Sequence, residues 1–158
     1  MRSGVIQRAQ RDSWSGWERG TTCSISRGVS GGIAAAQQGH DVIMTPTSHA
    51  YFDYAQGEPA LEPFSIGGNI PLERVYAFEP VPAVLTPEQA THVLGAQGNV
   101  WTEYLKTPDR VEWMVFPRML AMAEVTWSPA SARDWERFIE RLPSALAALA
   151  AFSVTRTY

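Results

Sequence analysis

The stretch "SGGIAAAQQGHDVIMTP", residues 30–46, contains the signals that decide the fold. Its first half is a short helix-prone run, Ile33 to Gln38, and the Gly39 that follows is a residue common just past a helix end. The next four residues, "DVIM" (41–44), are apolar, partly β-branched and bounded by a proline, as in a buried parallel strand. The order helix, tight turn, strand predicts an α/β fold with parallel strands.

The same alternation continues downstream. Thr86 can cap a helix over residues 86–95, with Gln89 completing a capping box. The run "AQGNVW" (96–101) is predicted as the second strand, and Thr107 is predicted to cap the helix after it. A second helix–strand–helix unit is therefore expected in the C-terminal half.

The C-terminal third is predicted to be helical, with two interruptions by proline. Pro117 is expected to kink or split the helix that follows Thr107, and Pro143 to interrupt a last helix that begins at Ser131. In the helix that follows Thr107, helical spacing predicts one buried face. Its residues are Val111, Met114, Val115, Met119, Met122 and Ala123. The other expected packing residues are Trp113, Trp127, Trp135, Phe138, Ile139 and Leu142.

Two loops that follow predicted strands combine aromatic residues with an acid. They are "TPTSHAYFDYAQ" (45–56) and "WTEYLKTP" (101–108). In parallel α/β folds the loops at the C-terminal ends of the strands carry the chemistry. A further loop, residues 55–85, is rich in proline, with a turn of helix expected at "LERVYAF" (72–78). Loops of this length inside compact domains are usually functional or disordered.

Composition limits the classes of partner. The chain has 158 residues, enough for one domain, and a formal net charge of −3, which gives no electrostatic reason to expect nucleic acid or an anionic membrane. No run approaches the roughly 18 apolar residues of a membrane span, and the first 20 residues lack the apolar core of a signal peptide. Cys23 is the only cysteine, so no internal disulfide is expected. Compartment and oligomeric state stay open.

An aromatic wall beside carboxylates, without a cluster of cations, is typical of a sugar site. Trp101 would contact the apolar face of a pyranose, while Asp53 and Glu103 would accept hydrogen bonds from its hydroxyls. Tyr51 offers a donor that can point at a developing negative oxygen. The same residues also fit a plainer interpretation, in which the tryptophan packs in the core and the acids are ordinary loop residues.

Other kinds of site are weakly indicated. His40, His49 and His92 lack the close spacing of a zinc pair, so neither a metal nor a cofactor is expected. The glycine pairs are not followed by a phosphate-loop lysine, and no G-x-S-x-G motif of a serine hydrolase occurs.

Five ordered stretches between Arg27 and Phe152 resemble the C-terminal part of the catalytic domain of family 20 glycoside hydrolases, the β-N-acetylhexosaminidases. They are "GGIAAAQQGHDVIMTP", "YFDYAQ", "IGGNIPLERVYAFEP", "LGAQGNVWTEY" and "VEWMVFPRMLAMAEVTWS". The resemblance implies about the last three βα units of a (β/α)₈ TIM barrel, an incomplete barrel because a full one has roughly 250 residues. Residues 26–158 are assigned to this barrel, and residues 1–25, which are not family-like, are expected to be irregular.

The resemblance also implies a role for individual residues. Tyr51 resembles the tyrosine that orients the substrate's acetamide group, and Asp53 the acid that accepts a hydroxyl near the 6-position. Trp101 resembles the tryptophan at the base of the pocket for the terminal sugar, and Glu103 the acid that holds the 4-hydroxyl. Phe78 stands where some relatives place a tryptophan near the next sugar.

Three features of the sequence depart from the family's pattern. The Asp–Glu pair that usually stands in a "GGDE"-like motif is absent, as is an arginine that helps to hold the sugar. Ser26, in "ISRG", stands where the family usually has a pocket tryptophan. Residues 1–25 do not match the segment that should precede them. A truncated or frame-disturbed gene model would account for all three departures.

The resemblance thus predicts hydrolysis of terminal N-acetylglucosamine or N-acetylgalactosamine from glycans or chito-oligosaccharides. In this family the substrate's own acetamide is the nucleophile, an exception to the usual two-carboxylate scheme. The isolated chain is expected to have little or no activity, because a general acid typically contributes about 10²–10⁴-fold to the rate. Two alternatives stay open: a non-catalytic carbohydrate-binding remnant, and a product that does not fold stably.

Overall fold

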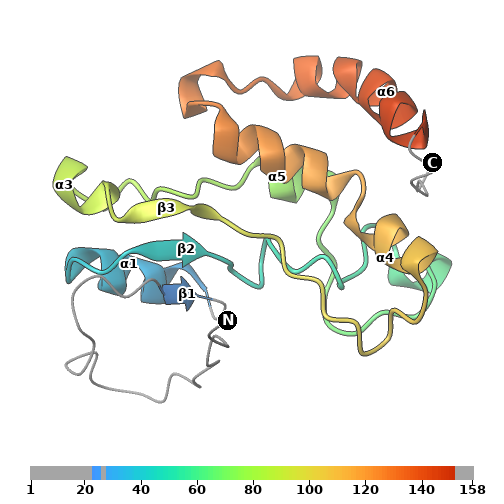
Figure 1. The fold of residues 1–158 in the computed structure, drawn as a ribbon, viewed down its shortest axis with the longest axis horizontal. Coiled ribbons are helices and arrows are strands. Elements are labelled where there is room, and N and C mark those ends of the chain that lie inside the picture. Colours follow the sequence, from blue (N-terminus) through green and yellow to red (C-terminus); the bar gives the residue numbers. More distant parts are fainter. Residues whose placement is uncertain (1–22, 26–27, 152–158) are drawn as a thin grey trace.

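A three-stranded parallel sheet forms one side of the molecule (Figure 1). The computed structural model describes residues 23–25 and 28–151. The middle strand β2 (Val42–Met44) pairs with β1 (Cys23–Ile25) on one side and with β3 (Val93–Ala96) on the other. The predicted α/β alternation with parallel strands is confirmed. The prediction that residues 1–25 are irregular is wrong for Cys23–Ile25, which form β1, and its remaining residues lie outside the described ones.

Helix α1 (Val29–Gln37) packs against β1 and β2. Met44 and Val42 are fully buried, whereas Ile43 between them is half-buried and points to the opposite face of the sheet, because side chains alternate along a strand. Gly32 allows the close approach of helix and strand, since a Cβ here would overlap the sulfur of Met44. The helix–turn–strand unit read from the sequence is therefore also the best-packed part of the sheet.

Strand β3 lies earlier in the chain than predicted. Thr86 forms the expected capping box, but helix α3 (Pro87–Ala90) has only four residues. None of them is buried, so tertiary packing does not support a longer helix. The β-branched Val93 pairs with Val42 in the sheet instead. The predictions of a helix to residue 95 and of a strand over 96–101 are therefore wrong.

Proline divides the helical segment that follows, as predicted. Helix α4 (Pro108–Val115) ends before Pro117, and α5 (Arg118–Trp127) begins directly after it. The Thr107 hydroxyl caps α4 by accepting a hydrogen bond from a backbone N–H at 3.3 Å. Helix α2 (Leu72–Tyr76), the predicted turn in the proline-rich loop, packs against α5. A short 3₁₀ turn at Pro59–Leu61 interrupts the same loop.

The buried face of α5 shares only Met122 with the predicted one. Its buried residues follow i, i+3, i+4, i+7 spacing: Arg118, Ala121, Met122 and Val125. Met122, and Met114 in α4, are buried as predicted, and Val111, Val115 and Met119 are half-buried. Ala123 and Trp127 are exposed, Trp127 to 91%, so their assignment to the core is wrong. The helix packs against α2, and its buried face begins at Arg118.

The last helix, α6 (Trp135–Ala151), starts later than predicted and is not interrupted. A 3₁₀ turn at Ala130–Ala132 precedes it, and Asp134 caps it by accepting a hydrogen bond from a backbone N–H at 3.1 Å. Pro143 lies inside α6 on its exposed side, where the loss of one backbone donor does not end the helix. Phe138 and Leu142 are buried as expected, Trp135 is half-buried, and Ile139 is exposed against expectation.

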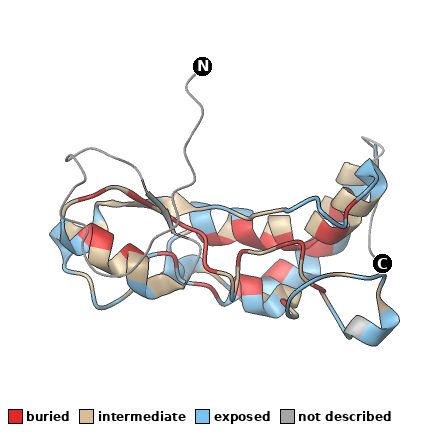
Figure 2. Ribbon diagram, turned by 90° about the horizontal axis from the view of Figure 1, so that it is seen from below, coloured by how far each residue is buried: buried red, intermediate tan, exposed pale blue. Residues whose placement is uncertain are grey.

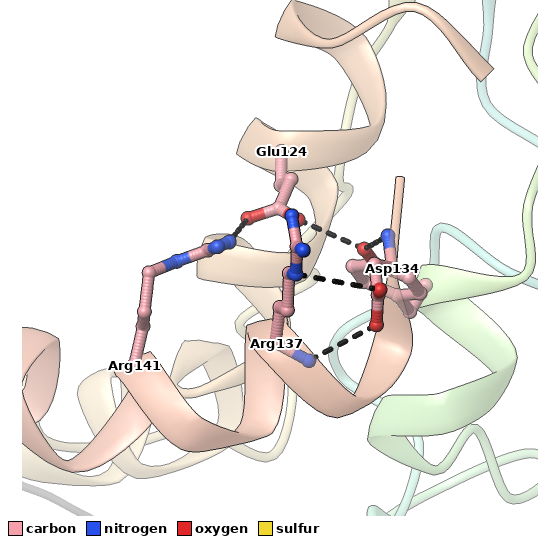
Figure 3. A network of polar contacts seen from close by, with 5 residues as sticks. Glu124, Asp134, Arg137 and Arg141 are labelled. Atoms are coloured by element: carbon pink, nitrogen blue, oxygen red, sulfur yellow. Dashed lines mark hydrogen bonds and ion pairs between the residues drawn. The ribbon is translucent and has the colours of Figure 1, made fainter. Parts of the chain in front are cut away.

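A polar cluster joins α2, α5 and α6 (Figure 3). The Tyr76 hydroxyl donates a hydrogen bond to Glu124 at 2.8 Å and accepts one from the backbone N–H of Asp134 at 2.8 Å. Arg141 donates to the second carboxylate oxygen of Glu124 at 2.5 Å. These four residues, Tyr76, Glu124, Asp134 and Arg141, are called the helix junction below. Each helix meets the junction through a different residue, so the cluster fixes their mutual orientation.

The burial pattern is uneven around the sheet (Figure 2). Within the described ranges β3 pairs with β2 alone, so one of its edges is open. A shallow apolar groove of about 450 Å³ runs between this edge and α5. Its lining includes Ile43, Leu94, Ala96, Met119, Met122 and Ala123. Apolar side chains are therefore exposed along the side of the sheet opposite β1.

Candidate functional site

The two aromatic–acid loops run side by side beyond the C-terminal ends of β2 and β3. Tyr51 and Asn99 form an isolated parallel bridge, in which the Phe52 amide donates to the Asn99 carbonyl at 2.7 Å. The Asn99 amide donates back to the Ala50 carbonyl at 2.6 Å. Gly98 permits this approach because a Cβ there would press on the Phe52 ring. The pairing of the strands therefore continues into the loops and holds their side chains together.

Three aromatic rings gather at this crossing. The Tyr51 ring lies 5.6 Å from the Tyr54 ring and 6.4 Å from the Trp101 ring, measured between centroids. Trp101 is 44% exposed, so it is partly accessible to solvent. The plainer interpretation, in which Trp101 packs in the core, does not fit this exposure.

Asp53 is the buried acid of the site. It is 5% exposed, and its Oδ1 atom has no hydrogen-bond partner among the described residues. Burial raises the pKa of Asp53, against the opposing effects of its own backbone N–H, the backbone N–H of Trp101 and the charge of Arg118. A buried carboxylate with a vacant acceptor atom is destabilising unless a donor reaches it.

Glu103 completes the group. Its side chain is exposed, and its negative charge adds to the rise in the pKa of Asp53. The charge of Asp53 in turn contributes, after burial, to a raised pKa of Tyr54. The structure thus brings Tyr51, Asp53, Trp101 and Glu103 to one place, and these four residues are called the site group below.

Phe78 does not join the site group. Its ring is 3% exposed and stacks on His49 with centroids 5.1 Å apart. The Phe78 backbone is also held in place, because the Arg133 guanidinium donates a hydrogen bond to its carbonyl at 3.4 Å. A buried ring has no free face for a sugar, so the predicted substrate contact of Phe78 has no support in this geometry.

His49 and His92 contact different residues. The ring of His49 contacts the Ser48 hydroxyl at 2.8 Å, and burial followed by the charge of Arg74 lowers the pKa of His49. His92 lies 3.0 Å from Asp41, and neither residue belongs to the two loops. Within residues 23–25 and 28–151, no cluster of His, Cys, Asp and Glu could hold a metal ion, and no helix is long and apolar enough to cross a membrane.

Arg118 is the residue near the site that the sequence analysis missed. It is fully buried, and its guanidinium donates to the carbonyl of Phe52, the residue directly before Asp53, at 2.7 Å. A signal was present in the sequence. Met114, Arg118 and Met122 are spaced four residues apart, so an arginine occupies a position that the helical pattern assigns to the core.

A comparison with known protein families identifies the fold that carries this site. The model of the glycosyl hydrolase family 20 catalytic domain matches residues 12–130, which is more than half of the chain. The chain belongs to glycosyl hydrolase family 20. The match begins within residues 1–25 and includes all four residues of the site group.

Family 20 proteins of several bacteria are similar to this chain. A β-hexosaminidase of Porphyromonas gingivalis is 51% identical over 120 residues, which are 75% of this chain and 15% of that protein. A β-N-acetylhexosaminidase of Cellulomonas fimi is 37% identical over 113 residues, 70% of this chain and 22% of that protein. Glycosidases of this family are therefore its relatives, and the chain spans less than a quarter of the length of either one.

A solved family 20 structure shows the same arrangement of elements. It is the exo β-N-acetylglucosaminidase of Vibrio harveyi in complex with N-acetylglucosamine, which superposes with a TM-score of 0.77 at 30% identity. The superposition covers 90% of this chain and 22% of that enzyme. The fold of the described residues is thus that of one segment of a larger family 20 protein.

Proposed function

We propose that this chain forms part of the sugar pocket of a β-N-acetylhexosaminidase, and that the site group holds the terminal N-acetylhexosamine. The observation that carries the proposal is the unpartnered Oδ1 atom of Asp53, buried next to the backbone of the exposed Trp101. A sugar hydroxyl is a neutral donor that can satisfy this oxygen. The Vibrio harveyi relative binds N-acetylglucosamine, which agrees with this class of ligand.

The members of the site group have separable roles in this proposal. The partly exposed indole of Trp101 stacks against the C–H groups of the pyranose ring. Asp53 accepts a hydroxyl near the 6-position, and the exposed Glu103 accepts the 4-hydroxyl. Tyr51, whose ring lies beside the indole, donates its hydroxyl to the acetamide oxygen and so orients it. Together these contacts would select a terminal sugar with free hydroxyls and a 2-acetamido group.

Orientation of the acetamide matters because, in this family's mechanism, it is the nucleophile. Its oxygen attacks the anomeric carbon while a general acid protonates the leaving oxygen, and the resulting oxazolinium ion is then opened by water. Holding a reacting group in an attack geometry removes much of the entropic barrier. Tyr51 and Trp101 would contribute to that geometry, whereas the proton must come from another residue.

The general acid is proposed to lie outside this chain. No aspartate among the 158 residues is followed by glutamate, so the family's Asp–Glu pair does not occur here. The site group binds and orients, and none of its members is placed by the resemblance as the proton donor. We therefore infer that the chain by itself is inactive or nearly so.

The same reasoning extends to the fold. We propose that residues 26–158 supply about the last three βα units of a (β/α)₈ barrel. Support comes from three parallel strands in sequential order, of which β1 lies directly before residue 26. It also comes from the edge of β3 that is unpaired within the described residues and from the groove beside it. A closed barrel has no such edge. The remaining strands of a longer protein would pair with β3 and cover the groove.

The experiment that tests the binding proposal is a titration of the purified chain with N-acetylglucosamine, followed by tryptophan fluorescence. A saturable change that Trp101→Phe reduces is expected, with Trp127→Phe as the matched control, because Trp127 is 91% exposed on α5 and outside the site group. No saturable change in a chain that melts cooperatively would contradict the proposal. A non-cooperative melt would support the alternative of an unstable product.

A turnover assay on an aryl N-acetyl-β-glucosaminide tests the inference about the general acid. Sugar binding without turnover is expected for the chain alone. Robust turnover would show that the chain contains its own proton donor and would overturn that inference. Binding without turnover is also the behaviour of a carbohydrate-binding remnant. Sequencing upstream of the coding region for a "GGDE"-like motif separates this remnant from a segment of an active enzyme.

A further inference from the structure

Arg118 is a buried charged residue, and no salt bridge among the described residues accounts for its burial. It is the first residue of α5 and the largest fully buried side chain among the described residues. No carboxylate contacts its guanidinium as an ion pair in the described part of the chain. A buried charge is strongly destabilising unless it is well hydrogen-bonded. The contacts that satisfy Arg118 therefore indicate what it does.

Among the residues that the structure describes, every hydrogen bond of the Arg118 side chain goes to a backbone carbonyl. It donates to Phe52 at 2.7 Å, to Ile70 at 3.1 Å and to Ala55 at 3.4 Å. It also donates twice to Met114, in the preceding helix, at 3.2 and 2.5 Å. The guanidinium carbon lies 5.1 Å from the centre of the Phe52 ring. One planar group thus holds three points of the 52–70 loop against the start of α5.

The three loop carbonyls belong to a backbone that is already paired with itself. Ala55 and Asn69 form an isolated parallel bridge, and the Ile70 amide donates to the Ala55 carbonyl at 2.8 Å. Arg118 binds both ends of this pairing and also the peptide between Phe52 and Asp53. The Phe52 amide is fixed on its other side by Asn99. The backbone that carries Asp53 is therefore held from α5 and from the Trp101 loop at the same time.

We propose that Arg118 is a positioning residue of the sugar site: through its hydrogen bond to the Phe52 carbonyl it fixes the direction of the Asp53 side chain. The sugar-site part of this inference rests on the function proposed above. The charged groups that act on Asp53 are Arg118 and Glu103, and those that act on Arg118 are Glu62 and Asp53. Burial lowers the pKa of Arg118 to about 9, and the guanidinium, charged at neutral pH, favours the ionised form of Asp53.

The chemistry of this position favours arginine over lysine. The carbonyls of Met114, Phe52 and Ile70 approach from different segments, and a planar guanidinium presents five N–H donors in fixed directions. An ammonium group has three donors around one atom and cannot bridge the same span. Arg118→Lys therefore keeps the positive charge but releases part of the loop, whereas Arg118→Met removes both.

The first arm of the test uses the ligand-free 158-residue chain, so it does not depend on sugar binding. In Arg118→Lys we expect amide hydrogen exchange at Phe52 and Ile70 to become about tenfold faster, the effect of one lost hydrogen bond. Exchange at Val42, which donates to His92 in the sheet, should not change. In Arg118→Met the carboxyl titration of Asp53, followed by carbon NMR, should move up by about one pH unit.

Arg133 provides a matched control. It too donates to backbone carbonyls, of Ser128 and Phe78, but on the side of the molecule near α6. Arg133→Lys should leave the exchange at Phe52 and the titration of Asp53 unchanged. Unchanged exchange at Phe52 in Arg118→Lys, or an equal change in Arg133→Lys, would overturn the proposal. If Arg118→Lys does not melt cooperatively, Arg118 serves the whole fold and the proposal fails.

The second arm is the N-acetylglucosamine titration of the same variants. About tenfold weaker binding is expected for Arg118→Lys, with the pH midpoint of binding kept, and a raised midpoint for Arg118→Met. Wild-type affinity in Arg118→Lys would overturn the positioning role. If the unsubstituted chain does not bind the sugar, the proposed function fails, and with it the sugar-site part of this inference. The exchange arm still decides whether Arg118 holds the Asp53 loop.

Discussion

Asp53 and Glu124 are both carboxylates set among aromatic rings, but the structure surrounds them differently. Glu124, in the helix junction, binds the Tyr76 hydroxyl with one oxygen and Arg141 with the other. Asp53, in the site group, is more deeply buried and has one oxygen without a partner. The carboxylate that joins helices has a hydrogen-bond partner for each oxygen, whereas the carboxylate on a loop has one oxygen without a partner among the described residues. We interpret the unsatisfied acid as the one that meets a ligand.

This difference predicts opposite behaviour of the two acids in sugar binding. Asp53→Asn should weaken N-acetylglucosamine binding by about ten- to a hundredfold, the range for a hydrogen bond to a charged group. Glu124→Gln should leave the binding unchanged, because the helix junction lies outside the site group. Fluorescence titration of both variants measures the effect. Equal weakening in both would mean that Asp53 has no special role.

For the stability of the fold, we expect the opposite order: substitution of Glu124 should have the larger effect and substitution of Asp53 the smaller one. Glu124→Ala removes the acceptor of two hydrogen bonds and leaves the Tyr76 hydroxyl and Arg141 without it. We expect the free energy of unfolding to fall by about 2 kcal/mol, an effect of the size expected when a buried donor, here the Tyr76 hydroxyl, is left unpaired. Urea denaturation of both variants gives the values. Asp53→Asn should not destabilise the fold at pH 7, and a loss as large as that of Glu124→Ala would count against a ligand-binding role.

A smaller loss of stability is expected when Tyr76, the donor of the hydrogen bond to Glu124, is substituted. Tyr76→Phe keeps the ring that packs on Trp135 and Phe138 but removes the hydroxyl that bridges Glu124 and Asp134. The free energy of unfolding should fall by about 1 kcal/mol, or about 2–4 °C in Tm. Tyr51→Phe is the control, because no hydrogen bond of its hydroxyl supports the fold among the described residues. An unchanged Tm in Tyr76→Phe would remove the helix junction as a source of stability.

The smallest effect concerns pH. The pKa of Asp53 is raised above its ordinary value of 3.8, so the folded chain holds this proton more firmly than the unfolded one. Stability from this group is complete below the unfolded pKa and is lost as pH rises through the folded pKa. Asp53→Asn should therefore gain Tm relative to the unsubstituted chain as pH rises from about 3 to 7, by at most a few degrees. A difference that does not change with pH would contradict the raised pKa.

The sequence predicted those elements of the fold that local chemistry determines. The α1–β2 unit, the caps at Thr86 and Thr107 and the break at Pro117 all depend on residues close together in the chain. The errors arose where tertiary packing decides. Val93 joins a strand because β2 offers a partner, and Pro143 stays within α6 because its missing donor lies on the exposed side.

In the site, too, the features set by local sequence were predictable, and those set by tertiary packing were not. Loop position and residue type predicted a site of Tyr51, Asp53, Trp101 and Glu103, and the structure places these residues near one another, while their role in sugar binding stays a prediction. Phe78 was placed in the site by resemblance, although its ring stacks on His49 in the interior. The helical spacing of Arg118 indicated a core position, but the sequence could not show its role, because its partners other than Met114 are backbone carbonyls 48 to 66 residues away.

The free edge of β3 has a practical consequence for work with this chain. Unpaired N–H and C=O groups on an exposed strand are a template for edge-to-edge pairing between molecules, which leads to aggregation. The neighbouring Leu94, 58% exposed, would strengthen such contacts. Aggregation would quench or scatter the fluorescence signal on which the titrations depend. Leu94→Lys places a charge on that edge at a position outside the site group, and is the variant to carry through every measurement.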